Sequence, residues 1–357
     1  MSRLEKSWQR YARWLMPLGS AYAAAMRLRA SAFRRGILQQ RRASLPVVSV
    51  GNLHLGGSGK TPVVEWLARA LTQKGYRPAI VSRGYGRRTA PHQLVVVSDG
   101  YALQASPEAG GDEPVMLAKA LPAVPIVVCG DRYRAALFVA EHTRADCIIL
   151  DDGFQHLALA RDFDLVLLDA SICHQRVFPA GYLREPLSAL SRADAFVLPA
   201  TAQNEKDFLN WLERTLPERP QFWMQAAAQQ IECPSTGEIV PPTQLAGTRV
   251  LGFAGIAAPQ RFFDTLRKLG LDVVEQAFED HACYTRQQLA GLIEQARCLG
   301  CAALITTAKD AVKIPPEMMS GQLPLYVLRL SVDIEPKDEL LKAILARFEI
   351  GQRLGAA

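Results

Sequence analysis

The strongest chemical signal in this 357-residue sequence is a glycine-rich segment that follows a short apolar run. The apolar run covers residues 45–51, a helix is expected over residues 62–74, and Gly59, Lys60 and Thr61 lie between them. Glycines let the backbone wrap phosphate oxygens, and the start of a helix adds partial positive charge. A lysine and a threonine in this order are typical of residues that hold the β- and γ-phosphates and Mg²⁺. We therefore predict that a nucleoside triphosphate binds with Mg²⁺ to a loop of the following residues: His54, Leu55, Gly56, Gly57, Ser58, Gly59, Lys60 and Thr61.

His54 is a departure from the usual phosphate-loop pattern. That pattern, G-x-x-x-x-G-K-[ST], begins with a glycine, and His54 takes its place here. The histidine either contacts the nucleotide or serves as a turn residue, and the sequence leaves both interpretations open. A glycine-rich surface turn is the alternative for the whole segment, but its position between a strand and a helix favours phosphate binding.

Two pairs of adjacent acids supply the main catalytic and metal-binding candidates. Asp151 and Asp152 follow the apolar run 147–150, and acids at the carboxyl end of a buried parallel strand face the ligand crevice. Paired acids raise each other's pKa, which suits one metal ligand and one proton-handling group. Asp112 and Glu113 form a second pair in a turn, where one acid can hold Mg²⁺ while the other faces a substrate hydroxyl. A plain strand end and a plain turn are the respective alternatives.

One histidine and three charged loops complete the candidates. A lone histidine such as His281 is more often structural than catalytic. The loops are glycine-rich and charged and follow apolar runs, although surface loops are an equal alternative for each of them. They cover residues 82–86, 131–134 and 179–186 and include Tyr85, Arg132 and Arg184.

Apolar strand-like runs alternate with helical stretches through most of the chain. After the run at 45–51, further runs lie at 77–82, 125–129, 147–150 and 164–168. Such alternation predicts an α/β fold with a doubly wound, mainly parallel sheet, here of the P-loop type, and a smaller α/β unit begins near residue 249. The expected organisation is a basic amphipathic helix over 1–43, a P-loop domain over 44–205, a linker with a hairpin over 206–248 and a smaller α/β domain over 249–357.

The positive charge of the chain is concentrated at its N-terminus. Residues 1–42 contain ten Lys or Arg against one acid, a net charge of +9, whereas the whole chain carries +6. Aromatic and aliphatic residues recur there every three or four positions, which predicts an amphipathic helix that Pro17 and Gly19 kink or interrupt. The apolar part is too short to span a bilayer, and the arginines that follow argue against a signal peptide. An anionic membrane surface is the favoured partner, and packing on the chain's own domain or on another protein is the alternative.

The composition argues against several other classes of protein. A chain with 49% apolar and 21% charged residues is typical of globular proteins. Seven cysteines at irregular spacing, of which Cys298 and Cys301 form the one close pair, indicate reduced thiols in a cytosolic compartment. No nucleic-acid-binding module is recognisable, and no obligate protein partner is evident.

Taken together, these segments resemble the tetraacyldisaccharide 4′-kinases of lipid A biosynthesis. The resemblance extends from about residue 45 to residue 313, and its most specific part is Asp-Asp-Gly-Phe-Gln-His after a strand. The replaced first glycine of the phosphate loop is also the family's own variant. The matching motifs lie at residues 51–53, 56–62, 82–86, 111–114, 151–156, 179–181, 183–186, 280–281, 306–307 and 309–310.

The resemblance implies transfer of the γ-phosphoryl group of ATP to the 4′-hydroxyl of an acylated glucosamine disaccharide 1-phosphate. It implies a peripheral enzyme on the cytoplasmic face of the bacterial inner membrane. It also implies that Asp112 and His281 cooperate in activating the hydroxyl. The residues implied for Mg²⁺ are Thr61, Glu113 and Asp152. Those implied around the phosphates or the acceptor are Tyr85, Arg132, Asp151, Gln155 and Arg184.

Two other functions remain as alternatives from the sequence alone. A P-loop GTPase or metallochaperone ATPase is one, but Lys309 and Asp310 are adjacent, which is the wrong spacing for the guanine-reading Thr-Lys-x-Asp motif. A membrane-associated nucleotide-binding scaffold is the other, and two pairs of acids argue against it. Competition between ATP and GTP tests the first alternative, and the presence of a phosphorylated product tests the second.

Overall fold

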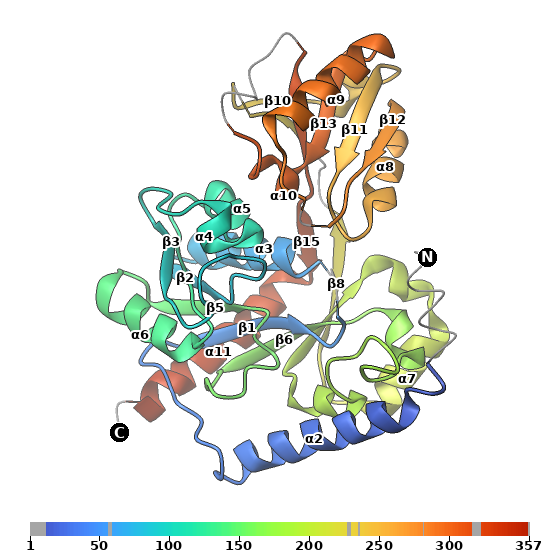
Figure 1. The fold of residues 1–357 in the computed structure, drawn as a ribbon. Helices are drawn as coiled ribbons and strands as arrows, with labels where there is room; N and C mark the ends of the chain where they lie inside the picture. The colour runs from blue at the N-terminus through green and yellow to red at the C-terminus, as the bar shows by residue number, and fades with distance from the viewer. Residues whose placement is uncertain are drawn as a thin grey trace.

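Two sheets of unequal size organise the computed structural model, which describes residues 12–55, 59–226, 230–234, 236–280, 282–315 and 323–355. The larger sheet has nine strands and the smaller sheet has six. Figure 1 shows the six-stranded unit above the nine-stranded unit, with β8 and β15 beside each other where the two units meet. We describe each unit in turn because the candidate site draws residues from both.

The nine-stranded sheet is parallel from β8 to β4, and one antiparallel strand closes each edge. Its inner strands are short, apolar and buried on both faces, as expected for parallel strands covered by helices. In sheet order the strands are β15 (Val332–Glu335), β8 (Gln221–Ala226), β7 (Ala195–Pro199), β6 (Phe163–Leu167), β1 (Val47–Asn52), β5 (Cys147–Asp151), β2 (Pro78–Ser82), β4 (Pro125–Val128) and β3 (Val95–Asp99).

Helices cover both faces of this sheet. On one face Val48 and Val50 of β1 pack in a core with α3 (Lys60–Gln73), α5 (Asp112–Ala120) and α11 (Lys337–Gly355). On the other face, neighbouring strand residues pack against α6 (Arg132–His142) and α7 (Lys206–Thr215). The remaining helical segments of this unit are α2 (Met16–Arg34), α4 (Pro107–Gly110) and the 3₁₀ turns η1 (Ala170–His174), η2 (Leu187–Arg192) and η3 (Ala200–Asn204).

The six-stranded sheet repeats the same construction on a smaller scale. Four neighbouring strands are parallel, namely β14, β13, β11 and β12. Strands β9 and β10 add an antiparallel edge next to β14. In sheet order the strands are β10 (Glu238–Val240), β9 (Gln230–Cys233), β14 (Leu325–Arg329), β13 (Ala303–Thr307), β11 (Arg249–Ala254) and β12 (Asp272–Ala277). Helix α8 (Pro259–Lys268) covers one face and α9 (Arg286–Cys298) the other, and η4 (Pro242–Leu245) and α10 (Ala308–Ala311) complete the unit.

The sheets confirm the predicted α/β class, but their strand composition differs from the expected domain boundaries. β8 lies in the nine-stranded sheet and β9 and β10 lie in the six-stranded sheet, so the expected linker 206–248 is divided between the two units. β15 and α11, which were expected to belong to the smaller domain 249–357, return to the larger sheet. Trp66 Nε1 donates a hydrogen bond to Asp333 of β15, and Phe348 of α11 packs against Tyr76. The six-stranded unit is therefore inserted between β8 and β15.

The N-terminal helix is more regular than the sequence suggested. Helix α2 begins at Met16, so Pro17 lies in its first turn, where a missing N–H costs nothing. Gly19 lies inside the helix at a close contact, since a Cβ there would be 3.0 Å from Ala180 Cβ. Tyr22 meets Phe178 edge to face at 6.0 Å. The expected interruption is therefore wrong, and α2 packs closely on its own unit through one face.

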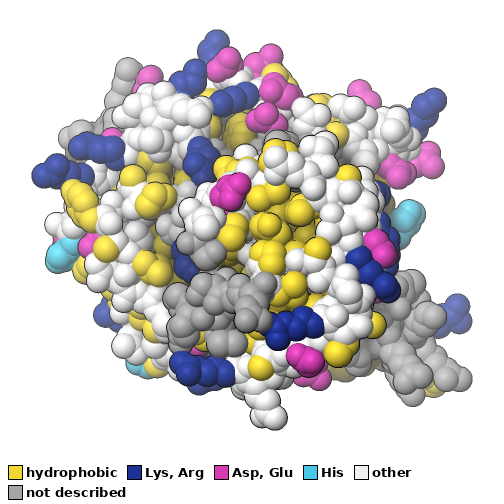
Figure 2. All heavy atoms as spheres, turned by 90° about the horizontal axis from the view of Figure 1, so that it is seen from above, with side chains coloured by type: hydrophobic (Ala, Val, Ile, Leu, Met, Phe, Trp, Pro, Cys, Tyr) yellow, Lys and Arg dark blue, Asp and Glu magenta, His cyan; other side chains and the backbone are white. Residues whose placement is uncertain are grey.

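Figure 2 shows the molecule from above, on the side of the six-stranded unit. Lys and Arg side chains are interspersed there with Asp and Glu around a group of hydrophobic side chains. This mixture agrees with a positive excess that belongs to the N-terminal arm, of which residues 1–11 lie outside the described structure. Among the described residues, no helix combines the length and apolar character needed to cross a membrane.

Candidate active site

The carboxyl ends of three adjacent strands bring polar residues together. Strand β1 ends at Asn52, β2 at Ser82 and β5 at Asp151, and β5 is hydrogen-bonded to both of the others. All three side chains are buried. In open α/β sheets, ligands bind outside these strand ends, so this edge is the place to look for the phosphate site.

Lys60 stands at the start of α3, directly after Gly59, whose φ of +77° places it in the left-handed region. Its Nζ donates a hydrogen bond of 3.0 Å to Asn52 Oδ1 and lies 3.3 Å from Asp152 Oδ1. Thr61 follows in the first turn of the helix. This arrangement has the strand, glycine turn and helix start of a phosphate loop; the predicted residues Gly56, Gly57 and Ser58 lie outside the described residues.

The first part of the loop is tied to a distant segment. His54 forms an isolated bridge with Leu183, and the Leu55 amide donates to the Tyr182 carbonyl at 2.7 Å. Burial lowers the pKa of His54, so its ring is neutral at neutral pH. A nucleotide contact by His54 or Leu55 stays a prediction.

Asp151 and Asp152 sit in a turn that glycine makes possible. A Cβ at Gly153 would lie 2.5 Å from Leu150 Cδ2, and Asp152 itself has a φ of 52°. Such strained backbone at a non-glycine residue is frequent in functional sites. The turn points the two carboxylates in different directions, and each has its own partners.

The pKa values of these two carboxyl groups move apart. Burial, with the charges of Glu113 and Asp152, raises the pKa of Asp151 to about 7, although Ser82 Oγ donates to it at 3.0 Å. Burial would also raise the pKa of Asp152, but Lys60 and Arg184 outweigh it and lower that pKa below its ordinary value. Two acids with opposite shifts suit proton transfer on one side and constant negative charge on the other.

The second acid pair occupies the first turn of α5. Gly111 precedes it with a φ of +95°, and a Cβ there would lie 3.0 Å from the Tyr85 carbonyl oxygen. Asp112 is largely buried and Glu113 is partly exposed. The charge of Glu113 contributes to the raised pKa of Asp151, so the second acid pair acts electrostatically on the first.

A cavity of about 460 Å³ opens beside Asp152, which directly follows β5. Its basic character sets it apart, since arginines from three different loops meet there. Arg132, at the start of α6, is only 7% exposed; burial and the nearby Arg83 lower its pKa to about 10. Arg184 Nη1 donates to Asp152 Oδ2 at 2.6 Å. The lining residues are Arg83, Pro91, His92, Gly130, Asp131, Arg132, Asp152, Gln155, His156 and Arg184.

Several donors in this cavity have no acceptor among the described residues. They are Arg132 Nε, Arg184 Nε and the His156 Nε2 position, all of them buried. Burial, together with Arg132, lowers the pKa of His156 to about 4, so its ring is neutral. Buried polar groups without partners are costly, and an anionic or hydroxyl-rich ligand would supply the missing acceptors.

The predicted acceptor contacts are only partly gathered here. Gln155 lines the cavity and donates from Nε2 to the Asn52 carbonyl at 2.8 Å, which joins the cavity to β1. Tyr85 lies on an exposed loop, with 72% of its surface accessible, and is not part of the lining. His281 lies outside the described residues. Arg83, His92 and His156 were not predicted as site residues from the sequence; Arg83 and His156 lie within motifs at 82–86 and 151–156, whereas His92 lies in no predicted motif.

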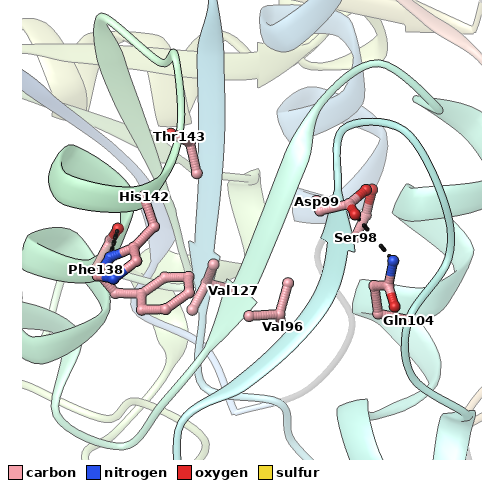
Figure 3. Close-up of a pocket in the computed structure, with 8 residues that line it drawn as sticks. All are labelled: Val96, Ser98, Asp99, Gln104, Val127, Phe138, His142 and Thr143. Carbon is pink, nitrogen blue, oxygen red and sulfur yellow. Dashed lines mark hydrogen bonds between the residues drawn. The ribbon is translucent and has the colours of Figure 1, made fainter.

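A second cavity, of about 350 Å³, lies between β3, β4 and α6 (Figure 3). His142 stacks on Phe138 with a ring distance of 4.4 Å, and Gln104 Nε2 donates to Asp99 at 2.9 Å. It shares no lining residue with the basic cavity, and Asp99 pairs with the first residue of β4, at the amino end of that strand. We therefore assign the functional site to the basic cavity and the phosphate loop.

The fold and this geometry define a P-loop phosphotransferase that binds a nucleoside triphosphate. A family model described as "LpxK: Tetraacyldisaccharide-1-P 4'-kinase" matches residues 11–349. The chain belongs to this family of kinases, as the relatives also show.

Tetraacyldisaccharide 4′-kinases from two bacteria are close relatives. The protein of Desulfotalea psychrophila is 41% identical over 93% of this chain and 96% of its own length. That of Geobacter metallireducens is 40% identical over 93% and 97%, respectively. The crystal structure of LpxK from Aquifex aeolicus in complex with ATP superposes with a TM-score of 0.76, at 32% identity, over 94% of this chain and 99% of that one. The similarity therefore covers both units of the fold.

Proposed function

We propose that this protein transfers the γ-phosphoryl group of ATP to the 4′-hydroxyl of an acylated glucosamine disaccharide 1-phosphate, the step that forms lipid IVA in lipid A biosynthesis. The observation that carries the proposal is the position of Asp152. It lies 3.3 Å from the phosphate-loop Lys60 and also lines the basic cavity. A triphosphate on the loop and an acceptor in the cavity would therefore meet at one carboxylate.

The residues of the chain divide the work of the reaction. Lys60 and the start of α3 bind the β- and γ-phosphates, while the basic cavity holds the acceptor through Arg132, Gln155 and Arg184. Asp112, with His281, takes the proton of the 4′-hydroxyl as its oxygen bonds to the γ-phosphorus and the bond to ADP breaks. Such a reaction needs positioning and neutralised charge rather than a covalent intermediate.

Mg²⁺ fits the proposed donor set. The charges of Glu113 and Asp152 both raise the pKa of the buried Asp151. The described residues contain no group of three or more His, Cys, Asp or Glu side chains placed to hold a metal ion by themselves, so the phosphates of ATP would supply further ligands. Mg²⁺ commonly binds through one or two carboxylates together with substrate phosphates, and Thr61 adds a hydroxyl at the helix start. When bound, the ion would neutralise charge on the β- and γ-phosphates.

Helix α2 supports a peripheral position on the cytoplasmic face of the inner membrane. Its packed face carries Gly19 and Ala23, whereas Trp14, Leu18 and Leu28 are exposed on the other side. Arginines flank this exposed apolar face, as in helices that lie in the plane of an anionic membrane surface. Because Arg29 Nη1 donates to the Gln155 carbonyl at 3.2 Å, the helix reaches the edge of the basic cavity. A lipid acceptor in the membrane would thus lie close to its site.

The proposal is tested with purified protein in detergent, γ-labelled ATP, Mg²⁺ and acylated disaccharide 1-phosphate. We expect a bisphosphorylated lipid from the wild-type protein and a loss of about 10²-fold or more in kcat for Asp112→Asn, because the general base is removed. The matched control is Asp264→Asn, an exposed aspartate of α8 that should keep full activity.

Each outcome has a separate meaning. If the wild-type protein binds ATP but forms no phosphorylated lipid, the acceptor assignment is wrong. If Asp112→Asn forms product at the wild-type rate, the kinase assignment holds and the base lies elsewhere, with Asp151 and His281 as the next variants to measure.

A further inference from the structure

We infer that Lys313 of the six-stranded unit is a positioning residue that holds Asp112 of the nine-stranded unit in place for catalysis. The inference rests on the proposed role of Asp112 in activating the acceptor hydroxyl. Lys313 Nζ lies 3.9 Å from Asp112 Oδ2, and α10 packs against α5, which carries Asp112 in its first turn. The contact thus joins the two units at the predicted base.

The backbone around Lys313 is fixed on both sides of the boundary. Val312 is buried in the core of the nine-stranded sheet, which also contains Val115 of α5. Ile314 is buried in the core formed by α9 and the six-stranded sheet. Because its two neighbours belong to different cores, Lys313 is held at the junction between the units.

A buried anchor also fixes the ammonium group. Lys313 Nζ lies 2.8 Å from Asp310 Oδ1 and 5.4 Å from the centre of the Tyr284 ring, and its side chain is only 5% exposed. The other oxygen of Asp310 accepts hydrogen bonds from the Gly255 amide at 3.0 Å and the Thr307 hydroxyl at 2.7 Å. These bonds fix the carboxylate of Asp310, and its ion pair with Lys313 places the ammonium group 3.9 Å from Asp112.

If Lys313 only neutralised the charge of Asp310, it would not need to lie next to Asp112. Asp310 is completely buried, whereas Asp112 keeps 14% of its side-chain surface exposed. An ammonium group has three donors, so Lys313 can serve both carboxylates. Lys309 of α10 contacts the neighbouring acid: its Nζ lies 3.9 Å from Glu113 and 3.4 Å from Asp280. The pair Lys309 and Lys313 thus matches the pair Asp112 and Glu113.

The consequence is that contact between the units sets the orientation of the proposed base. A small displacement of a reacting group costs much of the rate, even when substrates still bind. Loss of Lys313 should therefore lower kcat and leave the KM values for ATP and for the lipid nearly unchanged. A purely structural contact would instead lower stability and affect both parameters together.

The experiment is a double-mutant cycle of Lys313→Met and Asp112→Asn in the full-length protein, read by single-turnover and steady-state phosphorylation of the disaccharide lipid. We expect Lys313→Met to lower kcat about 10-fold or more, with Lys313→Arg restoring most of the loss. In the Asp112→Asn background the same substitution should have an effect of less than about 3-fold, because both residues act on one step. Lys268→Met, an exposed lysine of α8, is the matched control. ATP binding and thermal unfolding confirm that each variant is folded.

The outcomes separate this inference from the proposed function. Unchanged kcat in Lys313→Met, or equal losses in both backgrounds, overturns the positioning role while the base assignment stands. Unchanged kcat in Asp112→Asn overturns the base assignment, and the positioning role with it. If Lys313→Met does not fold, Lys313→Gln takes its place in the cycle, since it keeps a polar end on the side chain without the charge, and the same two results decide.

Discussion

The nine-stranded and six-stranded sheets both carry polar residues where their inner parallel strands end, but the partners of these residues differ. In the larger sheet, Asp152 borders a cavity in which the Nε atoms of Arg132 and Arg184 have no acceptor among the described residues. In the smaller sheet, Thr306 donates to the Phe253 carbonyl, and Thr307 and Asp310 bond to each other. Polar strand ends alone therefore do not mark a ligand site; in the larger sheet they also border a basic cavity lined by three arginines.

Under the proposed function, the two units contribute differently to one reaction. The larger unit supplies the phosphate loop, the acids and the basic cavity. The smaller unit, although built in the same way, uses its polar network to hold Lys309 and Lys313 against Asp112 and Glu113. We expect substitutions in the two units to have different effects on binding and turnover.

The largest effect should come from the phosphate loop. Lys60→Met removes the cation that contacts Asn52 and Asp152, so kcat/KM should fall about 10³-fold through lost charge stabilisation of the transferred group. Lys74→Met, at the end of the same helix and exposed, should change activity little. Phosphorylation assays with both variants check this prediction. Similar losses in both would contradict a specific role of Lys60 in stabilising the transferred group.

The return of α11 to the larger sheet predicts a stability effect that differs between the units. Phe348→Ala should destabilise the nine-stranded unit by about 3 kcal/mol, because the side chain is buried in its core. Leu292→Ala, at a buried position of α9, should affect the six-stranded unit instead.

Thermal unfolding with and without ATP measures this difference. The transition that ATP shifts upward should be the one that Phe348→Ala lowers. If Leu292→Ala lowers it equally, the two units unfold together and the comparison of their stabilities does not apply.

A smaller effect is expected at the membrane. Leu28→Ser removes an exposed apolar side chain from α2 and should weaken binding to anionic vesicles about 5-fold, or about 1 kcal/mol. Leu330→Ser, half-exposed near the junction of the units, is the control and should not change binding. Co-sedimentation with vesicles distinguishes them, and equal binding of the Leu28 variant and the wild type would argue against α2 as the contact.

The smallest effect concerns pH. The pKa of Asp151 is about 7 in the folded chain and near 3.8 when exposed, so between these values the folded state holds a proton that the unfolded state has lost. Its contribution to stability is therefore complete below about pH 4 and decreases as the pH rises to 7. In Asp151→Asn the thermal midpoint should fall less between pH 5 and pH 8, measured without metal. Parallel curves for the two proteins would mean that the group titrates in its ordinary range.

Local patterns allowed the sequence to predict most of the elements. Short apolar runs located β1, β2, β4, β5 and β6, and the glycine-rich segment located Lys60 and Thr61, because each depends on neighbouring residues. β15 and α11 were assigned to the wrong unit since no local pattern shows which sheet a strand joins.

The site was predicted in part for the same reason. Family motifs indicated Asp112, Asp151 and Asp152, but the cavity made by Arg83, Arg132 and His156 depends on loops that lie far apart in the chain. Lys313 was missed because its importance comes from a contact between the units. Such contacts require the tertiary structure.

The insertion of the six-stranded unit between β8 and β15 has a consequence for synthesis on the ribosome. Strand β15 pairs with β8, so residues 221–226 must wait for residues 332–335 before this edge of the sheet is complete. All strands of the smaller sheet are translated within that interval. We expect the nascent chain to expose the apolar face of β8 and the pocket for α11 until translation has passed residue 348, which makes this period the one in which a chaperone would be most useful.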